Sequence, residues 1–479
     1  MKKTIYVTTA IPYVNAQPHI GHALELVQAD VIARYHRLIG NATRFQTGTD
    51  ENAFKNVTAA REKGIPTEQL VSENSLAFQN LCHSLQISHD DFIRTTEDRH
   101  RLAVHKLWRQ LRRGDIYKAS YQGLYCVGCE DFVLEKGLVD GCCPDHRKPP
   151  IPVEEENYFF RLSHYQSQIE DLIESGRISV IPSKRKNEVL SFIRSGLHDF
   201  SVSREAARAG GWGIPVPDDP SQVIYVWADA LTNYISGLGF GQGDDWQRFW
   251  SEDTKKIHVI GKNVWKFHAV YWPAMLISAG LPTPDEIVVH GFLTIDNQKI
   301  SKSLGNTVDP LEYVETYGAD AVRHYLLRAV SPYEDGDFSQ ERFTGIYNAD
   351  LANELGNLLS RLTTLCERAK YGQHECELIP EPPAGYTEAL NSYEFDKAIA
   401  SLWSIVSRLN RDIEREKPWE SLKANDRISV RQHLRKWLSD LRCVGYWLEP
   451  FLPNASKKIL EALGRKSVEV VEPLFPRVR

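Results

Sequence analysis

Two histidines three residues apart are the first candidates for chemistry in this chain. His19 and His22 flank Gly21 in the stretch PYVNAQPHIGHALE, residues 12–25, directly after an apolar run typical of a strand. Residues three apart share one face of a helix, and a helix N-terminus offers unpaired N–H donors with a positive dipole end. A phosphate group suits such a turn, and a glycine lets a flat adenine ring approach the backbone. Two surface histidines near a turn would show the same spacing, so the pair alone does not decide between these interpretations.

A lysine-rich segment supplies a second candidate for phosphate binding. KISKS, residues 299–303, lies in the stretch DNQKISKSLGN, after the last predicted strand. Two lysines among serines, bounded by glycine and asparagine, form a basic loop that suits a polyphosphate, although most such loops are simply solvated. Groups that follow the first and last strands of an α/β sheet meet at the carboxyl ends of the strands, where such folds bind ligands. The two segments together predict a site for a nucleoside triphosphate.

Four of the eight cysteines cluster between residues 126 and 143. Cys126 and Cys129 form one close pair, and Cys143 and His146 form another after a loop. This spacing closes a tetrahedral zinc site, and because no ligand position is open the role is structural. We expect one zinc ion that holds a small insertion over the active site, although Cys142 could replace Cys143 as a ligand.

The elements that must position these groups follow from hydrophobic periodicity. Strand, helix and strand patterns over residues 3–9, 19–40 and 43–50 predict a parallel doubly wound sheet. The pattern breaks over residues 116–150, resumes with the predicted strand QVIYVWAD, and ends with the strand EIVVHGFL. From about residue 345 only long amphipathic helices are predicted. The expected fold is α/β, a doubly wound parallel (Rossmann-type) sheet split by a zinc-binding insertion, followed by an all-α helix bundle.

Composition excludes several classes of protein. The 479 residues are 42% hydrophobic and 25% charged, with a formal net charge of -6, as in an ordinary globular protein. Overall charge therefore cannot hold a nucleic acid, and any such partner needs local patches and specific contacts. The N-terminal residues are typical of a strand rather than a signal peptide, and no apolar run is long enough to cross a bilayer. We expect a cytoplasmic protein without a membrane partner.

The motifs HIGH, residues 19–22, and KISKS resemble the two signatures of class I aminoacyl-tRNA synthetases, the second usually written KMSKS. Within that class the chain resembles the methionyl-tRNA synthetases, from TTAIPYVNAQPHIGHALE through TGTDE, YVWADALTNY and FHAVYWPAML to PLFPR. The resemblance implies a ligase that activates L-methionine with ATP, releasing pyrophosphate. It then transfers methionine from the adenylate to the 3′-terminal adenosine of initiator and elongator tRNA(Met). Mg²⁺ would arrive with ATP.

The resemblance also implies roles for individual residues. Catalysis would fall to His19, His22, Lys299 and Lys302, and ATP would in addition contact Gly21, Glu25, Gly261 and Ser301. Methionine would be bound by Ile11, Tyr13, Asp50, Trp227, Ala230, Tyr234, Val264 and His268. Of these, Asp50 would contact the ammonium group of the substrate. The anticodon would be read by Asn357, Arg361 and Trp419. Core packing explains Trp227 and Val264 equally well, and a solvated helix face is the ordinary explanation for Asn357 and Arg361.

The implied domain order places the two halves of the catalytic sheet at residues 1–115 and 223–292. The insertion covers 116–222, the lysine loop and stem-contact region 293–345, and the anticodon-binding helices 346–479. The insertion is too short for the editing domain of the isoleucine, leucine and valine enzymes. With little chain after PLFPR for a dimerising appendage, a monomer is expected.

The chain departs from the family pattern at four positions, Asn52, Ala53, Asn263 and Phe200, which affects the outer pocket wall and the inhibitor profile. Two alternatives remain open at this point. One is a class I synthetase-like ligase that charges another amino acid or carrier, and the other is a catalytically silent tRNA-binding regulator.

Overall fold

The computed structural model describes residues 2–126, 131–133, 135–144, 147–296, 298–299, 307–371, 379–464 and 470–478, with the backbone alone for Tyr121, Asp131, Phe132, Lys136 and Lys299. The chain divides into two compact units. Unit 1 comprises Met1–Pro18, Gly40–Leu81 and Ser88–His290. Unit 2 comprises His19–Ile39, Cys82–Ile87 and Gly291–Arg479.

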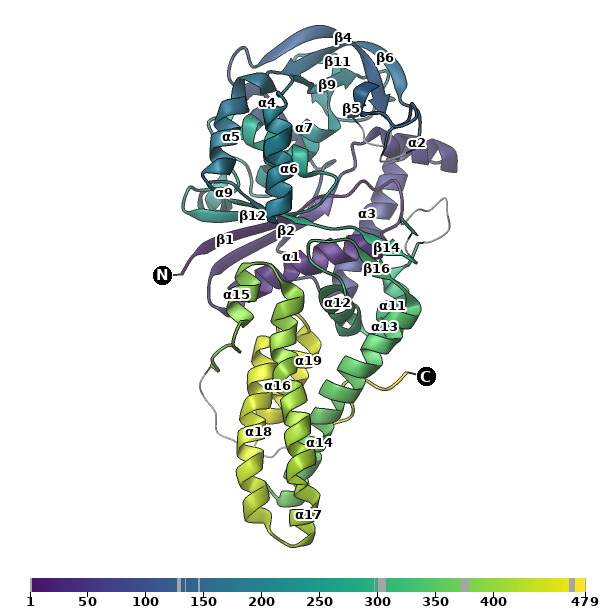
Figure 1. Ribbon diagram of the computed structural model, residues 1–479. Coiled ribbons are helices and arrows are strands. Elements are labelled where there is room, and N and C mark those ends of the chain that lie inside the picture. Colours follow the sequence, from purple (N-terminus) through teal and green to yellow (C-terminus); the bar gives the residue numbers. More distant parts are fainter. Residues whose placement is uncertain are drawn as a thin grey trace. The chain divides into compact units, whose positions relative to one another are not determined.

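Unit 1 is built on a six-stranded parallel sheet with the strand order β3-β2-β1-β12-β13-β7 (Figure 1). Five of the six residues of β1 are buried, which is typical of a central parallel strand with both faces covered. The strands are β1 (Thr4–Thr9), β2 (Ala42–Thr49), β3 (Asp91–Arg94), β7 (Ser179–Ile181), β12 (Thr254–Gly261) and β13 (Glu286–His290). The predicted parallel sheet is therefore present, and β1 coincides with the strand predicted over residues 3–9.

Gly48 allows β2 and β3 to pair closely. It lies opposite Ile93 in the parallel register, and a Cβ at Gly48 would collide with the carbonyl oxygen of Ile93. Only a glycine therefore fits at this position of the TGTDE stretch without moving β3.

Helices cover the sheet and form one large apolar core with it. The core joins strand residues such as Tyr6, Ile260 and Ile287 to helix residues such as Leu107 and Trp272. The helices of unit 1 are α2 (Phe54–Lys63), α3 (Thr67–Ser84), α4 (Asp98–Gln110), α5 (Gln166–Glu174), α6 (Ser183–Arg194), α7 (Val226–Leu231), α8 (Asn233–Ser236), α9 (Gly243–Phe249), the π-helix η3 (Phe267–Tyr271) and α10 (Trp272–Ser278).

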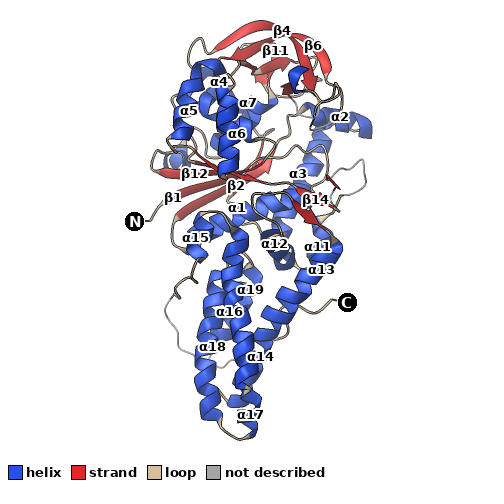
Figure 2. Ribbon diagram, in the orientation of Figure 1, coloured by secondary structure: helices blue, strands red, loops and turns tan. Residues whose placement is uncertain are grey.

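Two antiparallel sheets interrupt the parallel sheet in the sequence (Figure 2). One has the order β5-β4-β6-β8 and the other the order β10-β11-β9. Their strands are β4 (Ile116–Cys126), β5 (Asp131–Val133), β6 (Ile151–Phe160), β8 (Phe200–Ser201), β9 (Ser203–Glu205), β10 (Pro215–Val216) and β11 (Asp219–Ile224).

Two details of the predicted layout need correction. QVIYVWAD is not a strand of the parallel sheet, because β11 pairs antiparallel with β9 and β10 and helix α7 begins at Val226. The edge strand β7 comes from residues 179–181, so the range 116–222, predicted to be an insertion, also contributes to the parallel sheet. Strands of two to six residues carry too little periodicity to reveal which sheet they join.

Unit 2 combines helix α1 (Ile20–Leu38), a small sheet of order β15-β14-β16 and the C-terminal helices. The small sheet consists of β14 (Leu293–Ile295), β15 (Gln298–Lys299) and β16 (Gly336–Phe338). The helices are α11 (Pro310–Tyr317), α12 (Ala319–Arg328), α13 (Gln340–Ile346), the π-helix η5 (Tyr347–Gly356), α14 (Asn357–Ala369), α15 (Tyr386–Asn391), α16 (Phe395–Glu416), α17 (Pro418–Lys423), α18 (Arg427–Trp447) and α19 (Pro453–Gly464). Helices α14, α16 and α18 pack side by side, as the predicted bundle requires (Figure 1).

None of the helices in the described part of the chain combines the length and apolar composition that a bilayer crossing requires.

Candidate active site

The first turn of α1 holds the two histidines of the HIGH motif in one arrangement. His19 is the N-cap residue, and its Nδ1 accepts a hydrogen bond from the Gly21 N–H at 3.1 Å. The His22 Nδ1 accepts in turn from the His19 N–H at 3.1 Å, and the two rings stack with centroids 3.9 Å apart. Because both Nδ1 atoms are acceptors, a neutral ring carries its proton on Nε2. Each ring of the turn therefore carries its N–H donor on Nε2.

Both imidazoles are neutral at physiological pH. Burial lowers the pKa of His19 to about 4. Burial, and then the neighbouring His19, lower the pKa of His22 well below its ordinary value. Neutral donors can stabilise a phosphate oxygen without placing a formal positive charge in the site.

The chain on both sides of the lysine loop lies next to this turn. The Ile20 N–H donates to the Val308 carbonyl at 3.1 Å, and α1 packs against β14. Thr294 of β14 pairs with Lys299 of β15 in the antiparallel register. Ser301 and Lys302 lie outside the described residues, as does the side chain of Lys299. The HIGH turn and the two flanks of the KISKS segment therefore belong to one region of unit 2.

One part of the predicted methionine pocket forms at the ends of β1 and β2 in unit 1. Tyr13 and Asp50 form a parallel bridge beyond the strands, and the Asp50 N–H donates to the Pro12 carbonyl at 2.9 Å. Asp50 is buried, and the Tyr13 ring meets Trp227 edge-on with centroids 6.2 Å apart. Trp227 stacks on Phe267 at 3.6 Å. A buried carboxylate thus lies beside an aromatic wall.

The other part of the pocket is a hydrogen-bonded pair of rings. The His268 Nδ1–H donates to the Val264 carbonyl at 2.9 Å, so the His268 Nε2 accepts from the Tyr234 hydroxyl at 2.6 Å. Burial lowers the pKa of His268 to about 4, which keeps this ring neutral. The structure therefore brings Tyr234, Val264 and His268 together, as a binding pocket requires.

The remaining predicted residues of the pocket and nucleotide site have the following positions. Ala230 is buried on α7, one turn after Trp227, and Ile11 follows the end of β1. Gly261 ends β12 opposite His290, where an added Cβ would lie 3.1 Å from the Asn263 Oδ1. Glu25 lies in the second turn of α1.

Two family models match the chain along nearly its whole length. Residues 5–150 and 146–363 match the family described as tRNA synthetases class I (M). Residues 366–474 match the anticodon binding domain of methionyl tRNA ligase. The chain belongs to the methionyl-tRNA synthetase family. It is an aminoacyl-tRNA ligase, with methionine, ATP and tRNA(Met) as substrates.

Individual relatives cover nearly the whole chain. The methionine–tRNA ligase of Brucella suis biovar 1 is 40% identical over 99% of this chain and 98% of its own length. That of Rhizobium meliloti is 42% identical over 96% of this chain and 91% of its own. The Mycobacterium tuberculosis methionyl-tRNA synthetase in complex with methionyl-adenylate superposes with a TM-score of 0.90, at 36% identity over 100% of both chains.

Two of the three predicted anticodon residues of the enzyme, Arg361 and Trp419, lie close together in the helical domain. Asn357 begins α14, and Arg361 follows one turn later. The Arg361 guanidinium lies 5.8 Å from the ring centre of Trp419, the second residue of α17, and donates to Glu414 at 2.7 Å. A cation beside a tryptophan is a suitable surface for stacking and reading an unpaired base.

The predicted zinc ligands of the enzyme are only partly described. Cys126 ends β4 and is 3% exposed, and Cys143 is 1% exposed in a turn where the Arg147 N–H donates to the Cys143 carbonyl. Cys129 and His146 lie outside the described residues. Among the residues that are described, no group of three or more His, Cys, Asp or Glu side chains could hold a metal ion.

A buried polar chain next to the predicted methionine pocket was not anticipated from the sequence. Asn52 bonds to Asp229 at 2.7 Å, Asp229 to His100 at 2.6 Å, and His100 to Ser236 at 2.8 Å. His258 was also missed, although its ring stacks on Tyr234 with centroids 4.1 Å apart. The available signal in the sequence was a polar residue within an otherwise apolar strand or helix pattern. Such a signal does not reveal which residue the polar side chain contacts.

The depressed pKa of His268 makes stability depend on pH. Below about pH 6.5 the unfolded chain binds a proton at His268 that the folded chain does not bind until about pH 4, so stability falls as the pH falls through this window. Replacing His268→Gln should reduce the loss of unfolding free energy between about pH 7 and about pH 4.5 by about 2 kcal/mol. Denaturant unfolding at several pH values measures this difference. The exposed-histidine variant His83→Gln should retain the wild-type loss, and an unchanged loss in His268→Gln would contradict the assignment.

Proposed function

We propose that His19 and His22 stabilise the transition state in which the methionine carboxylate attacks the α-phosphate of ATP. The observation that carries this role is the pair of stacked neutral rings at the start of α1, each with Nδ1 accepting from the backbone and its proton on Nε2. The reaction needs no side-chain nucleophile. Positioning and stabilisation of charge on the phosphate oxygens supply most of the rate.

We further propose that the segment around Lys299 binds the pyrophosphate side of ATP. Lys299, Ser301 and Lys302 would stabilise the leaving group, with Mg²⁺ bound to the ATP. The bond between Ile20 and Val308 supports this assignment, because it ties the first turn of α1 to the residues just after this segment. Gly21, Glu25 and Gly261 would contact the adenosine part of ATP.

The methionine side chain is proposed to enter the pocket of unit 1. Asp50 would bind the substrate ammonium, and Trp227, Ala230, Val264 and Ile11 would line the aliphatic chain. A thioether is polarizable and favours aromatic neighbours, which Tyr13, Trp227 and Tyr234 provide. Because the Tyr234 proton is already donated to His268, the phenol presents its ring and oxygen lone pairs to the substrate.

Two further assignments concern tRNA and zinc. Asn357, Arg361 and Trp419 are proposed to read the anticodon of initiator and elongator tRNA(Met). Cys126, Cys129, Cys143 and His146 are proposed to hold one structural zinc ion, and the burial of Cys126 and Cys143 fits two thiolate ligands. We also infer a monomer that works in the cytoplasm.

The proposed chemistry is tested by amino-acid-dependent exchange of pyrophosphate into ATP. Wild type should support exchange with methionine and not with leucine, isoleucine or valine. His22→Asn should lower kcat about 100-fold, because one preorganised donor to the transition state is lost. The exposed control His83→Ala should keep wild-type kcat. A His22→Asn variant with wild-type kcat would refute the proposed role of the histidines.

Trp419→Ala should separate activation from tRNA charging. Loss of the stacking platform should lower kcat/KM for tRNA(Met) at least about tenfold, while methionine-dependent exchange stays within about twofold of wild type. Arg361→Ala should have the same effect. Arg415→Ala, at an exposed position of helix α16, should not. Equal losses in exchange and charging would mean that Trp419 serves folding rather than recognition.

Metal analysis of protein purified without chelators should find about one zinc per chain. Cys126→Ser and Cys143→Ser should lose the metal, while Cys142→Ser and the distant Cys443→Ser should retain it. The choice of Cys143 follows from its burial, whereas Cys142 is partly exposed and forms a backbone bridge with Val139. A zinc-free wild-type protein would refute the site.

A further inference from the structure

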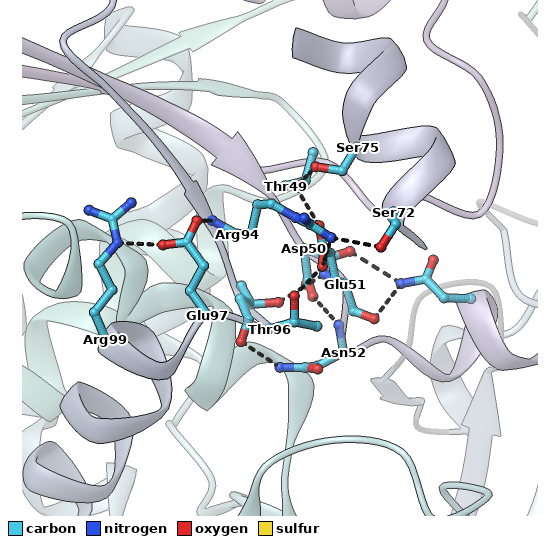
Figure 3. A network of polar contacts seen from close by, with 12 residues as sticks. Thr49, Asp50, Glu51, Asn52, Ser72, Ser75, Arg94, Thr96, Glu97 and Arg99 are labelled. Atoms are coloured by element: carbon cyan, nitrogen blue, oxygen red, sulfur yellow. Dashed lines mark hydrogen bonds and ion pairs between the residues drawn. The ribbon is translucent and has the colours of Figure 1, made fainter. Parts of the chain in front are cut away.

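The loop after β2 reaches the methionine pocket through Asn52. Its side-chain amide donates to the Asp229 carboxylate at 2.7 Å and to the Thr95 carbonyl at 3.1 Å. Both partners are acceptors, so the nitrogen of the carboxamide must face them. The Asn52 N–H also donates to the Asp50 carboxylate at 3.2 Å. One residue thus contacts both the proposed ammonium-binding carboxylate (Figure 3) and a second carboxylate, on helix α7.

Asp229 can hold helix α7, the proposed wall of the methionine pocket, in position. It lies on α7 between Trp227 and Ala230 and is 0% exposed. Its second oxygen lies 2.6 Å from the Nε2 of His100, which is also 0% exposed. A buried carboxylate needs donors on its oxygens, and charge-assisted bonds of this kind are short and orienting. The donor from Asn52 comes from the Asp50 loop, and the one from His100 comes from α4.

The rest of this loop is held in place by other bonds. The Glu51 carboxylate accepts from the Arg94 guanidinium at 2.7 and 3.1 Å and from the Thr96 hydroxyl (Figure 3). The Trp212 Nε1–H and the Asn56 amide donate to the Glu51 carbonyl. These bonds hold Glu51 at the end of β3. The loop therefore stays in place when the Asn52 side chain is removed.

We propose that Asn52 is a positioning residue for methionine binding. Its amide sets the distance between Asp50, on the ammonium side, and the α7 wall that carries Trp227 and Ala230. This inference rests on the proposed assignment of Asp50 and α7 to the methionine pocket. Pocket groups must be held within fractions of an ångström for tight binding, and a bond between the two carboxylate-bearing segments provides that restraint.

The test is steady-state pyrophosphate exchange with Asn52→Ala and Asn52→Asp. Asn52→Ala should raise KM for methionine roughly tenfold, the size expected for losing a bond to a buried charged group. Its kcat and its KM for ATP should stay within about twofold of wild type. Asn52→Asp should raise KM for methionine further, because it places a carboxylate against Asp229. Asn187→Ala and Asn187→Asp make the same changes at an exposed position of α6 and should match wild type.

The outcomes separate this inference from the pocket assignment. Asp50→Asn serves as the reference, and it should raise KM for methionine if the pocket is correctly assigned. If Asp50→Asn raises this KM and Asn52→Ala does not, the positioning role is refuted and the pocket stands. If Asn52→Ala raises the KM values for methionine and ATP equally, the residue supports the fold in general and the inference also fails. If Asp50→Asn itself has no effect, the pocket assignment is wrong.

Discussion

The parallel alignment of β1 between β2 and β12 is the constraint on which the proposed methionine pocket depends. The register places Thr8 opposite Gln46 and Thr9 opposite Val259, and it continues beyond the strands to pair Tyr13 with Asp50. A slip of one residue would turn each side chain of β1 to the opposite face and separate this pair. The buried threonines and tyrosine of β1 resist such a slip, because Tyr6 donates to Gln46 at 2.7 Å and Thr8 bonds to His258 at 2.6 Å.

Desolvation gives the histidines of the two units the same chemical character. His19, His22 and His268 all have pKa values lowered by burial, and each uses Nδ1 in a bond to the backbone. In each ring the backbone bond selects the tautomer, so the role of Nε2 follows from local geometry. His19 and His22 accept at Nδ1 and become Nε2–H donors, whereas His268 donates at Nδ1 and becomes an Nε2 acceptor for Tyr234. One residue type thus provides two N–H donors in the proposed phosphate site and an acceptor in the proposed methionine pocket.

Elements that depend on the local sequence pattern were predicted from the sequence, whereas contacts between residues that are distant in the sequence were not. Helix α1 and strand β1 were predicted within a few residues, because their periodicity is long and the HIGH turn marks the helix start. The family resemblance also grouped Arg361 with Trp419, which the structure places 5.8 Å apart. Strand β7, with three residues, has no readable period, and its partner β13 lies about one hundred positions away. The Asn52–Asp229 bond spans 177 positions, and the chemistry of neither residue specifies the other.

The position of α1 within unit 2 depends on a buried ionic cluster rather than on apolar packing alone. The Arg323 guanidinium is fully buried and bonds to Asp30 of α1 at 2.7 Å and to the carbonyls of Pro450 and Phe451. Arg34 of α1 bonds to the same carboxylate and to Glu449. Removing one partner of such a pair leaves a buried charge uncompensated, at a cost of about 3–5 kcal/mol. A shift of α1, with His19 and His22 at its start, must therefore move α12 and the chain before α19 together with it, since a separate movement would break these bonds. The position of the HIGH turn, residues 19–22, is thus set by the helical part of the chain, which also carries the proposed anticodon residues.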